Sequence, residues 1–147
     1  MKKFDIIIIG GGPAGLSALY FLSLSGYDVC LIERGKSYGE RIVEKTPYNI
    51  ANGIGGAGLF SDGKYSFPPS ASFLWTETNP DQLKKAYESI RSLVKTIGME
   101  FPKWSSNWVE EKNRAYEKKD YNSIYFSYEK QYQLTELLLG NMTLTHH

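Results

Sequence analysis

A glycine-rich turn near the N-terminus constrains the fold of this chain more than any other sequence feature. Residues 4–9, Phe-Asp-Ile-Ile-Ile-Ile, form a β-branched run with almost no polar alternation, which predicts a parallel strand covered on both faces. Gly10, Gly12 and Gly15 follow directly, in the spacing G-x-G-x-x-G. A glycine turn of this spacing directly after a buried strand is typical of dinucleotide-binding α/β folds.

The residues after the turn complete a strand–helix–strand unit. Residues 14–25 place apolar side chains at helical spacing, and Gly26 is well placed to end the helix. Residues 28–33, Asp-Val-Cys-Leu-Ile-Glu, form a second apolar strand. Strands joined in this way are parallel, and the connection between them is right-handed. The sequence therefore predicts an α/β fold that begins with a Rossmann-like β-α-β unit.

Each residue of the turn has a physical reason to be there if the turn holds a pyrophosphate. Gly10 allows the tight turn, Gly12 lacks the Cβ that would collide with the phosphates, and Gly15 lets the helix lie close to the strand. Pro13 and Ala14 begin the helix, whose first amides and positive dipole end attract an anion. We therefore predict that this turn binds a dinucleotide; the alternative is a merely structural turn.

An acidic residue stands where such a site needs one. Glu33 ends the second strand, 23 positions after Gly10, which matches the carboxylate that accepts hydrogen bonds from the adenosine ribose. A carboxylate there would repel the 2′-phosphate of NADP. The neighbouring Arg34 is open to two interpretations, a residue that approaches a phosphate or a solvated surface charge.

Two segments of the chain resemble a known group of flavoproteins. Gly-Gly-Gly-Pro-Ala-Gly-Leu-Ser-Ala with Ile-Glu-Arg-Gly resembles the N-terminus of FAD-dependent oxidoreductases of the glutathione-reductase-like superfamily. The stretch from Gly53 to Lys64, GIGGAGLFSDGK, resembles the bacterial NAD(FAD)-utilising dehydrogenases. The two matches cover residues 4–35 and 50–65, less than half of the chain.

The resemblance implies that the second glycine segment runs beside the ribityl chain and the flavin ring. Glycines there permit close backbone approach and positive φ angles, which expose amides to ligand oxygens. Lys64 would place a positive charge near the flavin edge where reduction builds negative charge. The alternative is a flexible loop in which Lys64 is only solvated. The residues implied at the flavin side are Gly55, Gly56, Ala57, Gly58, Ser61 and Lys64. The cofactor implied is FAD, with NAD(P)H as a candidate electron donor and a small molecule as substrate.

The rest of the chain shows weaker patterns. From Gly35 to Ala71 regular periodicity disappears. A helix is predicted from Asn79-Pro80 to Gly98. Further on, the patterns suggest a polar helix over 108–119, a strand over 123–128 and a helix over 130–139. We expect an N-terminal part of an FAD-binding domain at 1–72, and at 73–147 a partial helical or mixed segment that begins an inserted or substrate-side region.

Composition excludes several classes of function. The formal net charge of +1 offers no basic surface for nucleic acid or for an anionic membrane, and no apolar run has the length of a membrane span. The single cysteine, Cys30, fits a reducing compartment, so a cytoplasmic location is expected by elimination. No metal cluster and no catalytic acid, base or nucleophile stands out. One set of aromatic side chains forms either part of the core or the wall of a substrate pocket. It consists of Tyr65, Phe67, Phe73, Trp75, Trp104, Trp108, Tyr125 and Tyr128.

Known flavoproteins of this type are several hundred residues long, so this chain looks like an N-terminal piece with an incomplete Rossmann-like domain. A sheet of two or three parallel strands has open edges and little buried apolar area. We therefore expect weak or absent FAD affinity and no turnover for the chain alone. The leading hypothesis is the FAD-binding part of an oxidoreductase. The alternatives are an NAD-binding dehydrogenase module and a non-catalytic remnant or interaction module.

Overall fold

The computed structural model describes residues 2–44, 50–67, 79–105, 108 and 123–140. The chain folds as two compact units. The first unit comprises residues 1–61 and 131–147, and the second comprises residues 62–130. The expected boundary at residue 72, between an FAD-binding part and a following region, stays a prediction.

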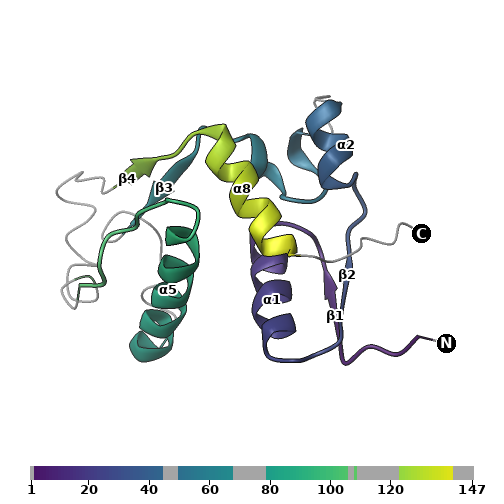
Figure 1. The fold of residues 1–147 in the computed structure, drawn as a ribbon, viewed down its shortest axis with the longest axis horizontal. Helices are drawn as coiled ribbons and strands as arrows, with labels where there is room; N and C mark the ends of the chain where they lie inside the picture. Colours follow the sequence, from purple (N-terminus) through teal and green to yellow (C-terminus); the bar gives the residue numbers. More distant parts are fainter. Residues whose placement is uncertain (1, 45–49, 68–78, 106–107, 109–122, 141–147) are drawn as a thin grey trace. The chain divides into compact units, whose positions relative to one another are not determined.

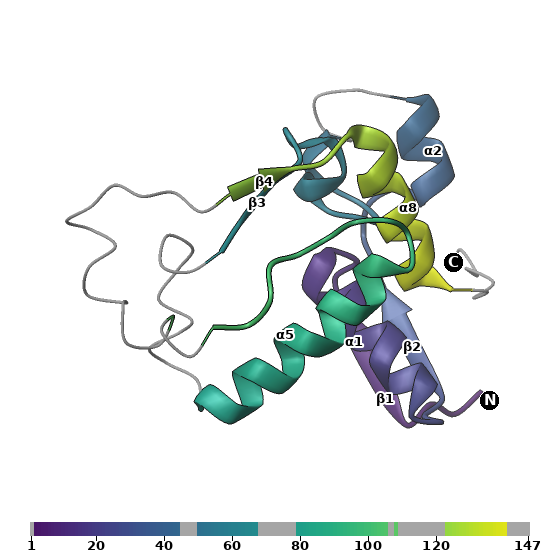
Figure 2. The same ribbon diagram turned by 60° about the vertical axis from the view of Figure 1, so that its left-hand side comes forward.

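The first unit begins with the predicted β-α-β arrangement. β1 (Ile6–Ile9) and β2 (Val29–Ile32) form a parallel pair in which Ile6 lies opposite Val29. The helix α1 (Pro13–Leu24) connects them and lies along one side of the pair in both views (Figures 1 and 2). Leu16 and Leu19 of this helix are buried. The α/β prediction is therefore confirmed, with element ends within two residues of those expected.

Over the residues that the structure describes, the pair of strands is covered on one face only. Ile8 points toward α1, since its Cγ2 lies 3.4 Å from where a Cβ on Gly15 would stand. On the opposite face Ile7, Ile9 and Ile32 are 60%, 86% and 51% exposed. The prediction of strands covered on both faces is therefore wrong here. A run of apolar residues shows that both faces of a strand can be buried. It does not show that another element packs on the second face.

Part of the segment expected to be irregular is in fact helical. α2 (Tyr38–Val43) follows Ser37, whose side chain accepts a hydrogen bond from the Glu40 amide, while the Glu40 carboxylate accepts one from the Ser37 amide. This reciprocal pair is a capping box. A short 3₁₀ helix, η1 (Ala57–Phe60), lies within the second glycine segment. The expectation of no regular structure between Gly35 and Ala71 is thus corrected, because local capping starts a helix too short to show periodicity.

The last helix, α8 (Tyr128–Leu139), begins in the second unit and continues into the first. Within the first unit, Tyr132 of α8 packs edge-on against Tyr38 and Phe60, with ring centroids 6.4 and 6.2 Å apart. Leu138 and Leu139 are buried. The helix predicted over 130–139 is confirmed, and Gly140, with φ +60°, ends it.

The second unit combines one long helix with a small antiparallel pair. β3 (Lys64–Ser66) pairs with β4 (Ser123–Tyr125). α5 (Pro80–Lys95) is capped by Asn79, whose side chain accepts from the amides of Asp81 and Gln82. The predicted helix at 79–98 is confirmed. The strand expected over 123–128 is shorter, since α8 begins at Tyr128, and the helix expected over 108–119 lies, apart from Trp108, outside the described residues.

Aromatic rings form the core of the second unit. Phe101 lies 5.0 Å from Phe67 and 5.4 Å from Tyr65, between ring centroids. Tyr87 packs in the same way against Trp104 and Trp108, at 5.7 and 5.4 Å. Rings that pack on one another in edge and tilted geometries stabilise a core. The contacts support the core interpretation for Tyr65, Phe67, Trp104 and Trp108. Tyr125 and Tyr128 are instead 62% and 56% exposed, and Phe73 and Trp75 lie outside the described residues.

Candidate nucleotide-binding site

The glycine turn joins β1 to α1 in a geometry that needs glycine at two of its positions. Gly10 has a φ of +103°, a conformation that L side chains rarely adopt, and its amide donates to the Ile32 carbonyl at 2.8 Å. A Cβ on Gly15 would lie 1.9 Å from the Gly10 carbonyl oxygen. Gly10 therefore permits the turn, and Gly15 permits the close contact between helix and strand.

Gly12 differs from these two glycines. Its φ of −76° is accessible to any residue. A Cβ at this position would have no neighbour within 4 Å among the described atoms. Pro13 and Ala14, which follow it at the start of α1, are exposed. The first-turn amides of a helix have no partner within the helix. Open space, exposed residues and helix amides thus lie together at Gly12.

The Glu33 carboxylate points toward the turn. It accepts hydrogen bonds from the Gly11 amide at 2.6 Å and the Gly35 amide at 2.8 Å. Burial acts to raise the pKa of Glu33. The amides of Gly11, Gly35 and Gly53, together with the charge of Arg34, outweigh that effect and hold the pKa below its usual range. Glu33 therefore binds the turn to two other segments, a structural role that sequence reasoning missed. Its predicted contact with a ribose stays a prediction.

The second glycine segment lies directly against the turn, although the two are about 40 residues apart in sequence. The Gly55 amide donates to the Gly11 carbonyl at 2.8 Å. A Cβ on Gly56 would lie 3.1 Å from the Gly12 Cα and 3.2 Å from the Pro13 Cδ. The structure thus brings together the two glycine segments that sequence analysis assigned to one nucleotide.

The amides of the second segment do not all face outward as expected. The Gly55 amide donates to the Gly11 carbonyl, and the Gly56 amide donates to the Gly53 carbonyl at 2.9 Å. The expectation of amides free for ligand oxygens is therefore wrong at Gly55 and Gly56, because the loop uses them to hold its own fold. Ala57 is exposed and Gly58 half-buried. Cofactor contact by Gly55, Gly56, Ala57 and Gly58 remains a prediction.

The other predicted residues lie in varied surroundings. The Ser61 Oγ stands 3.0 Å from both the Gly58 carbonyl and the Gln131 Oε1, so Ser61 links η1 to α8. Arg34 is exposed and donates to the Asn52 side chain at 3.2 Å. Lys64 belongs to the second unit, as the first residue of β3. Contacts of these three residues with a cofactor stay predictions.

Arg41 is a residue of this region that sequence reasoning did not find. Its side chain is 0% exposed. The guanidinium donates to the carbonyls of Ile50 and Gly56 at 2.9 Å each, to that of Gly53 at 3.4 Å, and to that of Ile54. An arginine four residues after a helix cap has no sequence signature of burial, since arginine is mostly a surface residue.

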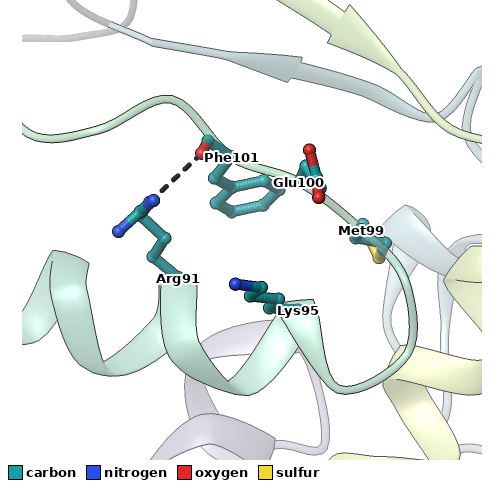
Figure 3. A pocket seen from close by; sticks show the side chains of 5 residues that line it. All are labelled: Arg91, Lys95, Met99, Glu100 and Phe101. Carbon is teal, nitrogen blue, oxygen red and sulfur yellow. Dashed lines mark hydrogen bonds between the residues drawn. The ribbon is translucent and has the colours of Figure 1, made fainter.

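A small pocket lies within the second unit. It is lined by Arg91, Lys95, Met99, Glu100 and Phe101 (Figure 3). Arg91 donates to the Phe101 carbonyl at 3.2 Å and to Glu88 at 3.1 Å. Its guanidinium is therefore hydrogen-bonded within the protein itself. Over the described part of the chain, no three His, Cys, Asp or Glu side chains gather as a metal site would require.

Comparison with known proteins identifies the N-terminal segment. Residues 5–41, which span β1, α1, β2 and most of α2, match the family described as FAD dependent oxidoreductase. This segment is thus similar to those of FAD-dependent oxidoreductases. FAD is the cofactor that the match indicates. Among the described helices, none has the length and apolar character needed to cross a membrane.

Curated relatives match part of the chain. Over 56 residues the chain is 38% identical to ferredoxin–NADP reductase 2 of Sulfolobus acidocaldarius, covering 38% of this chain and 17% of that protein. Over 54 residues it is 46% identical to digeranylgeranylglycerophospholipid reductase of Methanoculleus marisnigri, covering 37% and 12%. Over 41 residues it is 44% identical to thioredoxin reductase of Listeria monocytogenes, covering 28% and 13%. The chain thus matches a sixth or less of each relative's length, and no solved structure matches it.

Proposed function

We propose that this chain is the FAD-binding part of a flavin-dependent oxidoreductase of the glutathione-reductase-like superfamily. The reaction proposed for the whole enzyme is transfer of two electrons, as a hydride, between a small-molecule substrate and FAD. The flavin itself supplies the hydride chemistry. The segment from Gly53 to Lys64 favours the NAD(FAD)-utilising dehydrogenases within that superfamily.

One observation carries the proposal: Gly12 is a glycine that the protein's own fold does not need. Its backbone angles suit any residue, and a Cβ there would contact nothing within 4 Å among the described atoms. A glycine is needed at such a place when a ligand approaches the backbone closely. The ligand would meet the first amides of α1, which favour the negative charge of a pyrophosphate.

The residues proposed to hold FAD come from the glycine turn, the end of β2 and the second glycine segment. They are Gly10, Gly12, Pro13, Ala14 and Gly15 at the pyrophosphate, Glu33 at the ribose, Arg34 nearby, and Gly55, Gly56, Ala57, Gly58, Ser61 and Lys64 on the flavin side. Glu33 suits its role because it is an ionised carboxylate beside the turn. A carboxylate has about four lone-pair positions, so three amide bonds leave room for a ribose hydroxyl.

The names of the relatives support a reductase. One is named for NADP, and three are named as reductases. From these names we propose NAD(P)H as the electron donor of the whole enzyme. The substrate and the second electron partner belong to the whole protein and are proposed only as a small molecule.

We further propose that the chain alone has weak or absent FAD affinity and no turnover. The support is the open apolar face of Ile7, Ile9 and Ile32. A strand pair covered on one side contributes less buried apolar area than the sheet of a stable domain, so the site is held less rigidly.

The test compares wild type with Gly12→Val in FAD titrations followed by flavin fluorescence. Because the position is open in the protein, unfolding in urea should change by less than about 1 kcal/mol. FAD affinity should fall at least tenfold, about 1.4 kcal/mol, since the side chain fills the proposed phosphate space. Gly39→Ala, in α2 with no neighbour within 4 Å among the described atoms, is the matched control and should leave affinity unchanged.

Other results would decide against the proposal. Equal affinity in wild type and Gly12→Val places FAD elsewhere. Tighter binding of NAD than of FAD by wild type favours the dehydrogenase module. No binding of either nucleotide even by a longer chain that carries the rest of the domain favours a remnant. Abundant flavin bound after purification contradicts the weak affinity.

A further inference from the structure

We propose that Arg41 is a positioning residue of the nucleotide site, which holds segment 50–56 against the glycine turn without itself contacting the phosphates. This inference rests on the proposed function and deepens it. It concerns a residue that neither the glycine fingerprint nor the flavin-side resemblance includes.

The first step is the set of carbonyls that Arg41 gathers. Its two terminal nitrogens donate to four carbonyls, all within residues 50–56. The plane of the guanidinium fixes the directions of these bonds, so the segment must wrap around it in one arrangement. A lysine has a single nitrogen and cannot reproduce that arrangement.

The second step is that two side chains of opposite charge both bond to the backbone of Gly53. The Gly53 amide donates to Glu33, and the Gly53 carbonyl accepts from Arg41. Burial lowers the pKa of Arg41, and the Glu33 charge acts in the opposite direction. Glu33 and Arg41 thus hold the two peptide groups on either side of the Gly53 Cα, which fixes the orientation of the segment at this residue.

The third step leads from this segment to the site. Gly55, whose flanking carbonyls at Ile54 and Gly56 are bound to Arg41, donates its amide to the Gly11 carbonyl at 2.8 Å. Gly56 lies against Gly12, the open position of the turn. Movement of segment 50–56 would therefore move the wall of the nucleotide space.

The burial of Arg41 sets this role apart from a direct phosphate contact. With 0% exposure and its nitrogens turned to carbonyls, the guanidinium faces the interior of the first unit. A buried charge needs such hydrogen bonds to offset its lost hydration. Arg41 therefore acts on the ligand through the backbone that it holds.

The first arm of the test needs no ligand. Amide hydrogen exchange by NMR compares the Gly55 amide with the Gly10 amide, which bonds to the neighbouring strand at Ile32. Arg41→Lys should raise the exchange rate of Gly55 at least tenfold more than that of Gly10. Leu138→Ala, a buried change in α8 of the same unit, should raise both rates together. Equal effects in the two variants would overturn the proposal.

A second variant guards against Arg41→Lys failing to fold. In Gly53→Ala, the new Cβ would stand 2.7 Å from the Arg41 Cδ and 2.6 Å from the Lys36 carbonyl. It should push the segment off Arg41 and give the same selective rise at Gly55. Unchanged exchange there would also overturn the proposal.

The second arm uses FAD at several salt concentrations. Arg41→Gln, which removes the charge, should weaken FAD binding about tenfold and leave the salt dependence of the dissociation constant unchanged, because no charge contact with phosphate is lost. A flattened salt dependence would show direct contact and overturn the inference. If even a longer chain that carries the rest of the domain binds no FAD, the proposed function fails, and the exchange arm still decides the role of Arg41.

Discussion

The two units of this molecule are stabilised in different ways. In the first unit, two charged side chains join the glycine turn to segment 50–56 by hydrogen bonds to the main chain. Glu33 accepts from amides, and Arg41 donates to carbonyls. In the second unit, aromatic rings from β3, α5 and the segment after α5 pack on one another.

This difference follows from what each region is made of. Glycine segments have no side chains to pack, so they need polar groups from elsewhere to fix their conformation. Aromatic residues bury large areas and need few such groups. The first unit should therefore respond to loss of a glycine or a charge, and the second to loss of ring contacts or a buried hydroxyl. All three tryptophans, Trp75, Trp104 and Trp108, lie in residues 62–130, so their fluorescence follows the second unit.

The largest expected effect comes from Gly15→Ala. The added Cβ would lie 1.9 Å from the Gly10 carbonyl, a backbone atom that cannot move aside cheaply. We expect a loss of about 3 kcal/mol in the unfolding free energy of the first unit, measured by circular dichroism in urea, while the tryptophan transition stays in place. Gly39→Ala, whose Cβ meets no described atom within 4 Å, should instead raise stability by up to about 1 kcal/mol. A loss below 1 kcal/mol at Gly15 would show that α1 moves away from β1 easily.

The next effect is that of Glu33→Gln. The glutamine loses the charge and one acceptor oxygen, so one of the amides of Gly11, Gly35 and Gly53 loses its partner. We expect a loss of about 2 kcal/mol at neutral pH, the usual cost of an unsatisfied buried donor. Glu100→Gln, on an exposed side chain of the second unit, should cost less than about 0.5 kcal/mol.

The lowered pKa of Glu33 also predicts how the stability of the first unit depends on pH. Its folded pKa is lowered, so its contribution to stability is present above the unfolded pKa of about 4 and is lost as the pH falls through the folded pKa. Wild type should therefore lose stability in the first unit on acidification below about pH 4, and Glu33→Gln should lose less. Identical acid profiles for the two proteins would mean that the carboxylate is not held by those amides.

In the second unit the corresponding change is Tyr87→Phe. The Tyr87 hydroxyl donates to the Pro102 carbonyl at 2.8 Å, so its removal should cost about 1 kcal/mol. Burial, with a smaller effect of Glu88 that Arg91 opposes, raises the pKa of Tyr87 to about 12. The unfolded value is about 10, so stability should fall as the pH rises from 10 to 12.

Tryptophan fluorescence is the measurement for this change, since Tyr87 packs on Trp104 and Trp108. Tyr87→Phe should reduce the alkaline loss of stability without abolishing it, because burial also raises the pKa of Tyr65. Tyr125→Phe, on a side chain 62% exposed, is the control and should change neither quantity. An unaltered alkaline transition in Tyr87→Phe would contradict the raised pKa.

Sequence alone predicted the parts of the fold that depend on local pattern. The β-branched runs, the helix from Pro13 and the glycine spacing each fix a conformation within a few residues, and all three appear as expected. The carboxylate of Glu33 was also placed correctly beside the turn, because strand length and turn geometry determine where a strand ends.

The parts that were missed depend on residues far apart in sequence. The four carbonyls of Arg41 lie 9 to 15 positions away from it, and no periodicity marks such a contact. Gly35 is similar: a Cβ there would lie 2.5 Å from the Gly53 nitrogen, a clash that only the folded chain shows. The capping box at Ser37 and Glu40 is different, because its pattern was present in the sequence and the short helix after it was overlooked.

The smallest expected effect concerns the open face of the strand pair. Ile9 is 86% exposed, whereas the neighbouring Ile8 points toward α1. Ile9→Ser should therefore change the unfolding free energy by less than about 0.5 kcal/mol, and Ile8→Ser should lower it by about 2 kcal/mol. Urea unfolding followed by circular dichroism measures both. Because Ile8 and Ile9 are adjacent and of the same type, the difference between the two losses in unfolding free energy reports how far each face of the strand pair is buried. Equal losses would show that this face is buried in solution, and the strands would then be covered on both sides as their sequence predicts.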